Sequence, residues 1–246
     1  VRGGFSRLEV MLTTELMERV DVMKAALGHM GVDAPSVHAP FSLDRYITGH
    51  DRRWDGSMRK VLGIAEALGA KVIVFHPGHL PLLPFTYGLH LRNMLDNIGD
   101  FLPRASKSGV SLAMENVPRP GPFPLLRTRY LAWEPIEMIS IFGKLGKKGL
   151  KMTLDVSHSS AIGEGVAGEY VRHLGAYLCN VHLSDFDGRV DHLPIGRGRV
   201  NFERILRSIR DIRYDGPLTL ELSPSYSDAE DLLESRRRIE SILTTL

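Results

Sequence analysis

The feature of this sequence that most constrains its fold is a series of short apolar runs that stop at acidic or histidine residues. These runs alternate with segments of helical periodicity every 30 to 40 residues or so, which is typical of a parallel sheet with right-handed crossovers. The carboxyl ends of such strands meet at one edge of the sheet. Seven runs fit the pattern: residues 5–12, 35–41, 70–78, 110–118, 151–158, 177–185 and 217–224.

Helix signals fall between these runs. Side chains that can accept from free backbone N–H groups, and a proline suited to a first turn, mark where helices begin. The predicted starts are Thr13 or Thr14, Ser57, Pro135, Asn201 and a capping box formed by Ser227 with Glu230.

The pattern predicts an α/β fold, a TIM (β/α)8-type barrel that lacks the first strand–helix unit at the N-terminus. A chain of 246 residues matches the size of one such barrel, but only seven strands are found and four residues precede the first. No linker-like stretch divides the chain. We therefore expect a single domain spanning residues 1–246.

Charge and cysteine content restrict the classes of function. The 31 basic and 29 acidic residues leave a net charge of +2, too balanced to indicate a nucleic-acid-binding protein. Cys179 is the single cysteine, which excludes an internal disulfide and suits a reducing compartment. No apolar run is long enough to span a bilayer, and no signal peptide is found. These features predict a cytoplasmic protein without a membrane partner.

Potential metal ligands end six of the seven strands. In a closed barrel these ends converge, so the side chains would share one cavity. Each one alone has an ordinary interpretation as a core or ion-pairing residue, but together they would repel unless a cation lay among them. The sequence therefore predicts a divalent-metal site. The strand-end ligands are His38, His76, Glu115, Asp155, His182 and Glu221, with His158 and His192 in the adjoining loops.

The ligand types leave the number and kind of metal open. Glu115, Asp155, His182 and Glu221 form an oxygen-rich set that suits Mn²⁺, Co²⁺ or Mg²⁺. Adding the two histidines of the earlier strands creates a nitrogen-rich site that shares Glu115 and suits Zn²⁺ or iron. Two such metals can bridge an oxygen nucleophile.

Seven motifs in order along the chain resemble one known family. They are VHAPF, FHPG, LAMENVP, LDVSH, NVHLSD, DHLPIGRGRVNF and LTLELSP. Together they resemble the xylose isomerase-like TIM-barrel superfamily. That group contains sugar and sugar-phosphate isomerases and epimerases, and also the endonuclease IV type of apurinic-site nuclease (AP endonuclease family 2).

The resemblance to the keto-sugar 3-epimerases implies roles for particular residues. Glu115, Asp155, His182 and Glu221 correspond to their single-metal set, and the two glutamates there also move the proton on opposite faces of the sugar carbon. His158 matches a substrate-binding histidine. Gly121 stands where those enzymes carry a further substrate-binding glutamate, so this resemblance does not name the substrate.

The resemblance to the nuclease implies a different, three-zinc site. Eight of its nine ligands have a counterpart here, but the ninth position, an aspartate in the nuclease, is Val190, with Asp191 one residue out of register. On the sequence alone the third zinc would rest on His158 and His192, which is too few protein ligands for a tight site.

Three functions remain open at this stage. The first is a metal-dependent isomerase or epimerase that acts on a small sugar or sugar phosphate, with Glu115, Glu221 and His158 as catalytic residues. The second is a zinc phosphodiesterase at abasic sites, for which alone we expect nucleic acid as a partner. The third is a non-catalytic barrel that binds a ligand. The oligomeric state is open too, a homo-oligomer included.

The loop from residue 118 to 133 is the longest irregular segment predicted. Long loops in compact domains are often functional, and Arg119, Arg127 and Arg129 in this one could bind a phosphate. Trp54 and Trp133 are both expected in strand-to-helix loops, where an aromatic ring can floor a sugar site or pack under a lid.

Overall fold

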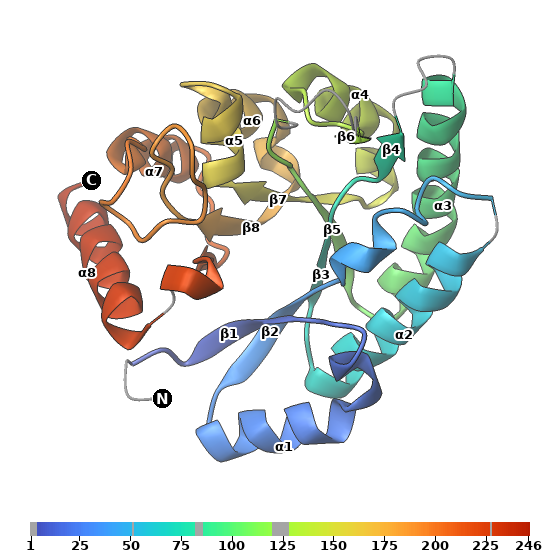
Figure 1. Ribbon diagram of the computed structural model, residues 1–246, viewed down its shortest axis with the longest axis horizontal. Coiled ribbons are helices and arrows are strands. Elements are labelled where there is room, and N and C mark those ends of the chain that lie inside the picture. The colour runs from blue at the N-terminus through green and yellow to red at the C-terminus, as the bar shows by residue number, and fades with distance from the viewer. Residues whose placement is uncertain (1–3, 51, 82–85, 120–127, 227) are drawn as a thin grey trace.

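The molecule is a ring of parallel strands covered on its outside by helices (Figure 1). The computed structural model describes residues 4–50, 52–81, 86–119, 128–226 and 228–246. The strands form one sheet in the order β1-β2-β3-β5-β7-β8-β9, and every neighbouring pair is parallel. Their bounds are β1 Arg7–Met11, β2 Asp33–His38, β3 Val72–Phe75, β5 Ser111–Glu115, β7 Lys151–Asp155, β8 Leu178–Leu183 and β9 Leu218–Leu220.

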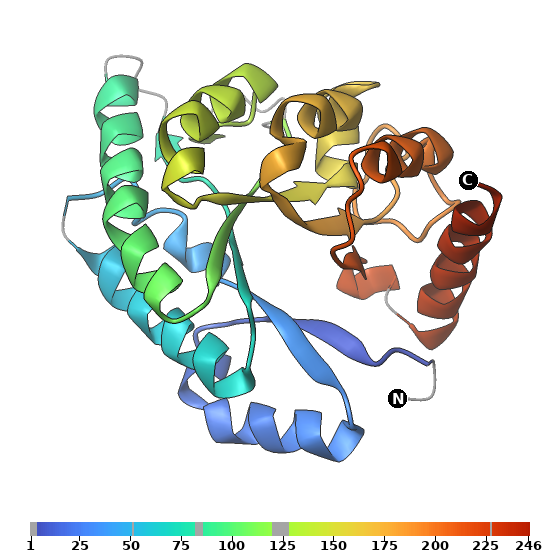
Figure 2. The same cartoon turned by 180° about the vertical axis from the view of Figure 1, so that it is seen from behind.

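Helices follow the strands and form the outer layer, as the reverse view also shows (Figure 2). In α7 the buried residues Phe202, Ile205, Leu206 and Ile209 recur at helical spacing, so one face packs inward and the arginine-rich face meets solvent. The helices are α1 Val20–Met30, α2 Arg53–Leu68, α3 Tyr87–Lys107, α4 Pro135–Leu145, α5 Val156–Ile162, α6 Val166–Leu174, α7 Phe202–Asp211 and α8 Ala229–Thr245.

The barrel is nearly closed, with its opening between β1 and β9. These two strands are the edges of the sheet and do not pair with each other. A cavity of about 670 Å³ lies between them, lined by Leu8 and Glu9 of β1, Leu218 and Leu220 of β9, and Leu232 of α8. A (β/α)8 barrel needs eight strands. The prediction of a TIM-type barrel with seven strands and one missing strand–helix unit is therefore confirmed.

Continuous apolar strands build the core because helices cover one face of the sheet and the barrel interior covers the other. In β3, Ile73, Val74 and Phe75 are all buried, and in β5 the same is true of Leu112 and Met114. One apolar cluster runs through the molecule from the end of β1 to α8. Among the described residues no helix is long and apolar enough to cross a membrane.

The predicted starts of helices are confirmed at some positions and wrong at others. Pro135 begins α4, and the Asn201 side chain caps α7 by accepting from the backbone N–H of Arg204. Thr13 instead accepts from Leu16 N at the start of the 3-10 turn Leu16–Glu18, and α1 begins only at Val20.

Two further corrections concern α2 and α8. Helix α2 begins at Arg53, four residues before Ser57. This places Trp54 inside the helix, where it is buried against Phe75 and Phe101, and not in a site loop. At α8 the cap is Asp228, which accepts from Asp231 N, and Ser227 lies outside the described residues.

The long predicted loop contains regular structure. Strand β4, His79–Pro81, pairs antiparallel with β6, Thr128–Tyr130, so the segment after β5 folds back over the segment after β3. Arg119 lies over the Trp133 ring, 6.0 Å from its centroid, while Gly121 and Arg127 are outside the described residues. A phosphate-binding role for the arginines of this loop stays a prediction.

Candidate metal centre

The carboxyl ends of the strands bring the predicted ligands together in three adjoining groups. In each group, the possible ligand atoms all lie within 4.8 Å of one another. All eight predicted ligands belong to at least one group, and Glu115 and Asp155 each belong to two. The groups are His38, His76 and Glu115; Glu115, Asp155, His182 and Glu221; and Asp155, His158 and His192.

The register of the sheet explains this convergence. Asp155, the last residue of β7, is paired with His182 on β8, and β5 ends at Glu115 beside Thr153 of β7. Glu221 follows β9 directly and is held by its backbone N–H, which donates to Leu183 O. Side chains far apart in the sequence therefore reach one rim because parallel strands end at one level.

The central group surrounds the imidazole of His182. Its Nδ1 lies 2.7 Å from Glu221 Oε2 and 3.4 Å from Glu115 Oε1. Buried polar atoms normally have hydrogen-bond partners. Here Glu115 Oε1, Asp155 Oδ2, His182 Nδ1 and Glu221 Oε2 are buried with no hydrogen bond of suitable geometry to the described residues. A cation-binding site is expected to have this arrangement, in which each of the four residues contributes one buried ligand atom without a hydrogen-bond partner.

The first group shares Glu115 with the central one. His38 Nε2 lies 3.1 Å and His76 Nε2 3.6 Å from the other carboxylate oxygen, Glu115 Oε2. The remote nitrogens of both rings are held away from the group: His38 Nδ1 by Ala39 O at 2.8 Å, and His76 Nδ1 by Asp44 Oδ2 at 3.3 Å. Such partners orient imidazoles for metal binding.

The third group is more complete than the sequence indicated. His158 Nε2 and His192 Nε2 are 3.0 Å apart, and a carboxylate oxygen of Asp155 joins them within the same 4.8 Å limit. The structure thus places a third potential ligand beside the two histidines that the sequence indicated. Asp155 lies at the N-cap of α5, where it also accepts from His158 N, so its carboxylate faces both the central and the third group.

The close packing of these groups shifts the pKa values of the three carboxylates. Burial favours the neutral form of Glu115, but the charge of His182 and the neighbouring imidazoles of His158 and His38 hold its pKa well below the usual value. Burial likewise opposes the charge of Glu221, and nearby His182 lowers the pKa of Glu221 to about 2. The pKa of Asp155 is raised by its burial and by repulsion from the two glutamates.

The histidines respond in the opposite direction. For His76, His158 and His182, burial lowers the pKa, but the neighbouring carboxylates outweigh it. The pKa of His158 is raised to about 9 by Asp155 and Glu115, and the pKa of His76 to about 10 by Asp44 and Glu115. In the absence of a cation, protons on the imidazoles thus balance the carboxylate charge. A divalent ion can take over that role, so the donor set fits a metal centre.

Asp185, two residues after the end of β8, belongs to none of the three groups and has a different role. Its carboxylate is buried and accepts from four backbone N–H groups: those of Phe186 and Val200 on Oδ1, at 2.8 and 3.0 Å, and those of Gly196 and Gly198 on Oδ2, at 2.8 and 2.9 Å. A Cβ at Gly198 would collide with this carboxylate. Asp185 therefore organises the loop that carries His192.

Several residues that position the site were missed by sequence reasoning. Glu9 on β1 contacts His182, and Asp44 contacts His76. Asn116 holds His158 through its backbone carbonyl and bridges the backbone of Asp155 through its side chain. The alternation of β1 was the one available signal, because an acidic residue between Leu8 and Val10 must face the side opposite to theirs.

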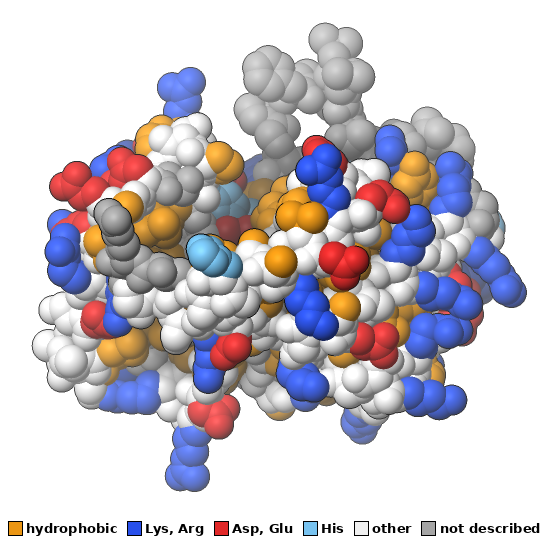
Figure 3. All heavy atoms as spheres, turned by 90° about the horizontal axis from the view of Figure 1, so that it is seen from below, with side chains coloured by type: hydrophobic (Ala, Val, Ile, Leu, Met, Phe, Trp, Pro, Cys, Tyr) orange, Lys and Arg blue, Asp and Glu red, His pale blue; other side chains and the backbone are white. Residues whose placement is uncertain are grey.

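Aromatic rings flank the histidines at the rim. Phe41 is half exposed and stacks on His76, with ring centroids 4.9 Å apart. Tyr130 of the β4–β6 pair packs against His76 and His79. Figure 3 shows one face of the molecule, with a hollow in which histidine and acidic side chains are visible and with basic and acidic side chains interspersed around it.

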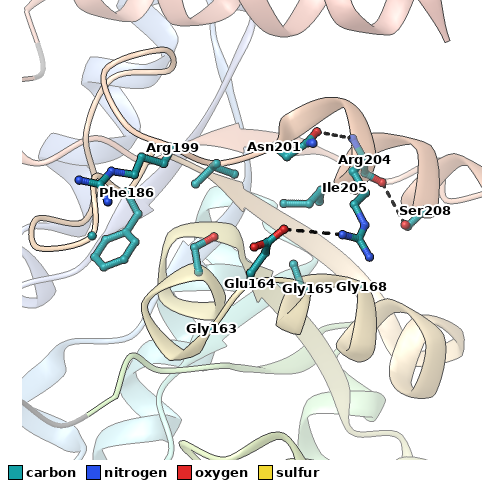
Figure 4. A pocket seen from close by; sticks show the side chains of 14 residues that line it. Gly163, Glu164, Gly165, Gly168, Phe186, Arg199, Asn201, Arg204, Ile205 and Ser208 are labelled. Carbon is teal, nitrogen blue, oxygen red and sulfur yellow. Dashed lines mark hydrogen bonds and ion pairs between the residues drawn. The ribbon is translucent and has the colours of Figure 1, made fainter.

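A second cavity lies apart from the metal groups, between the α5–α6 turn and α7 (Figure 4). It has a volume of about 260 Å³, and Glu164 and Arg204 face each other across it at 4.0 Å. Its lining includes Phe186 and Arg199 but none of the eight predicted ligands. The predicted ligands therefore make no contribution to this cavity.

Comparison with known proteins gives the family. The family described as "Xylose isomerase-like TIM barrel" matches residues 6–242, almost the whole chain. The chain belongs to this family. The resemblance predicted from the seven motifs is thereby confirmed.

Relatives within the xylose isomerase-like family carry different names. An uncharacterized protein of Methanocaldococcus jannaschii, MJ1311, is 28% identical over 75% of this chain and 63% of its own length. A probable endonuclease 4 of Phocaeicola vulgatus is 28% identical over 72% of this chain and 65% of its own length. The chain thus spans less than two thirds of these two proteins.

The solved structures include a D-tagatose 3-epimerase-like protein. It is 25% identical in sequence and superimposes with a TM-score of 0.82, covering 99% of this chain and 90% of that one. The likeness therefore extends over the entire ring of strands and helices, including the strand ends that carry the candidate metal centre.

Proposed function

We propose that this protein is a divalent-metal-dependent isomerase or epimerase that acts on a small sugar or sugar phosphate. The observation that supports it best is the placement of two glutamates around one imidazole. Glu115 from β5 and Glu221 after β9 approach His182 Nδ1 from different strands. The likeness to the D-tagatose 3-epimerase-like protein supports the same reaction class.

The chain's own residues can perform the proton transfer that such a reaction needs. When bound, a divalent cation would polarise the substrate carbonyl and make the neighbouring C–H more acidic. Both glutamates have a lowered pKa and are ionised at neutral pH, so either carboxylate can accept a proton. One ionised glutamate removes the proton; the other, which must first take up a proton from solvent, gives that proton to the opposite face, while His158 hydrogen-bonds the substrate.

The rim suits a small polyol in shape and chemistry. Asp155 and the imidazoles supply polar contacts, and the half-exposed ring of Phe41 supplies an apolar surface for the C–H face of a sugar. Pockets of this kind combine apolar walls with a few fixed polar groups. The residues that would hold the cation are Glu115, Asp155, His182 and Glu221, with Mn²⁺, Co²⁺ or Mg²⁺ favoured by the carboxylates.

The test is solvent exchange into a panel of ketoses and their phosphates. The protein loaded with Mn²⁺ or Co²⁺ is incubated in D₂O, and deuterium in the substrate is measured by NMR. We expect exchange beside the carbonyl that is lost in Glu115→Gln and in Glu221→Gln. Glu15→Gln, at an exposed carboxylate on the outside, is the matched control and keeps wild-type exchange. Absence of exchange over the whole panel refutes the proposal.

The third group of ligands favours one alternative, an endonuclease IV-like zinc phosphodiesterase acting at abasic sites in DNA. Asp155, His158 and His192 complete a set of three adjoining groups, which suits several zinc ions. A relative named as a probable endonuclease 4 supports it. Nicking of an abasic-site duplex by the zinc-loaded protein, lost in Glu115→Gln, would establish this activity in place of the first. The third possibility, a non-catalytic binder, predicts no activity in either assay and ligand binding that is unchanged in Glu115→Gln.

A further inference from the structure

Strand β1 sends one acidic side chain into the barrel. Leu8 and Val10 of this strand pack outward, against a cluster formed by Leu27, Val32 and Ala34. Successive residues of a strand face opposite sides, so Glu9 faces inward. Its side chain is only 8% exposed. A carboxylate buried in this way needs specific partners, because burying an unpaired charge is costly.

The partners of Glu9 lie across the barrel on β8. Glu9 Oε1 is 3.0 Å from His182 Nε2, and Glu9 Oε2 accepts from Asn180 Nδ2 at 2.9 Å. Strand β9 lies beyond β8 in the sheet, and the opening separates β9 from β1. These two contacts therefore join β1 to the opposite end of the open sheet, through the interior.

The ring of His182 has the opposite orientation to the rings of the other histidines of the centre. His38, His76, His158 and His192 all turn Nδ1 toward a carbonyl or carboxylate outside their group, and Nε2 inward. His182 turns Nδ1 inward, toward Glu221 and Glu115. Its Nε2 points away from the group, and Glu9 of β1 is the hydrogen-bond acceptor for this nitrogen.

Two neighbours compete for His182 Nε2. Glu9 can only accept when ionised, so it favours a proton on Nε2. Asn180 Nδ2, 3.0 Å away, is a donor and favours a lone pair there. A charge-assisted hydrogen bond is stronger than a neutral one, so Glu9 prevails. When a cation displaces the proton from Nδ1, the proton on Nε2 stays with Glu9 and the Nδ1 lone pair is available to the cation.

We infer that Glu9 is a positioning residue of the metal centre, which holds His182 in the tautomer that offers Nδ1 to the metal. The inference rests on the proposed metal site, whichever of the two activities that site performs. In Glu9→Gln the side chain can donate to Nε2, as Asn180 does, and the proton then moves to Nδ1. Loss of such a partner typically weakens metal affinity by about tenfold to a hundredfold.

Metal titration tests this inference without any substrate. Cobalt binding is followed by calorimetry and by the visible absorption of the bound ion. We expect Glu9→Gln to bind Co²⁺ ten to a hundred times more weakly, with an altered absorption spectrum. Glu18→Gln, an exposed carboxylate, controls for charge, and Ser36→Ala removes another hydrogen-bond partner of Glu9. Both controls should leave the affinity within threefold of wild type.

A measurement on the wild-type protein keeps the test decisive if the variant does not fold. In the zinc-loaded protein, ¹⁵N NMR of the His182 ring shows which nitrogen carries the proton. We expect the proton on Nε2 and the zinc on Nδ1. The reverse assignment overturns the inference, and so does wild-type cobalt affinity in a folded Glu9→Gln. A wild-type protein that binds no metal refutes the proposed metal site itself, and the role of Glu9 with it.

Discussion

Replacing Asp185 with asparagine should destabilise the loop that carries His192. Each carboxylate oxygen accepts from two backbone N–H groups, so four donors depend on this one side chain. Asparagine keeps one oxygen and turns an NH₂ group toward the other two donors, so two charge-assisted hydrogen bonds are lost. Hydrogen bonds to charged groups contribute about 1.5–3 kcal/mol each, which gives a loss of about 3–6 kcal/mol.

Urea unfolding measures the loss of stability of the whole protein, and amide hydrogen exchange measures it in the loop. We expect a lower urea midpoint for Asp185→Asn and faster exchange at Gly196, Gly198 and Val200. The matched control is Asp187→Asn in the same loop. There one oxygen, Oδ1, accepts from both Arg189 N and Val190 N, so asparagine can keep both bonds and the midpoint should change far less.

The reasoning would be refuted by an Asp185→Asn protein with a wild-type midpoint and unchanged amide exchange. An equal effect in both variants would also contradict it, because the argument depends on how many donors each oxygen serves. If the prediction holds, the third ligand group should suffer as well. His192 lies in the segment whose two ends are joined by the paired backbones of Asp185 and Leu193.

Four further predictions follow from burial and from the pKa values. The Trp54→Ala variant leaves a cavity beside Phe75 and Phe101 and should lose about 3–5 kcal/mol in the free energy of unfolding, measured in urea. Burial raises the pKa of Cys179 to about 12, so iodoacetamide at pH 8 should label this thiol only after unfolding. The raised pKa of His158, about 9, stabilises the metal-free fold fully below pH 6.5, and this contribution is lost as the pH rises through 9, so the melting temperature without metal should fall over that range. Cobalt affinity should also rise with pH, because Glu221, Glu9 and Glu115 raise the pKa of the proposed ligand His182 and the cation must displace its proton; a pH-independent affinity would contradict this.

From the sequence alone it was possible to predict the succession of strands along the chain and the candidate ligands at their carboxyl ends. Parallel strands with both faces covered need continuous apolar segments, and such segments are visible without coordinates, as in the run from Val72 to Phe75. The carboxyl ends of parallel strands meet at one rim, where polar side chains from different strands can contact one another. For that reason Glu115, Asp155 and His182 could be assigned to one rim from their positions alone.

Local signals were less reliable where tertiary contacts compete with them. Ser57 is a good capping residue, but α2 extends to Arg53 because the buried ring of Trp54 packs against Phe75 and Phe101. The β4–β6 pair could not be predicted either, because its two short strands are joined only when the ends of β3 and β5 are already side by side.

Only the tertiary structure decided how the ligands are grouped and held. Distances between side chains on different strands depend on sheet register and barrel curvature, which no local pattern contains. Thus Asp155 joins the third group, Asp185 turns away to bind backbone N–H groups, and Glu9 reaches His182 from the other edge of the sheet. Residue type determines what a side chain can bind, but the folded backbone determines which partners lie within reach.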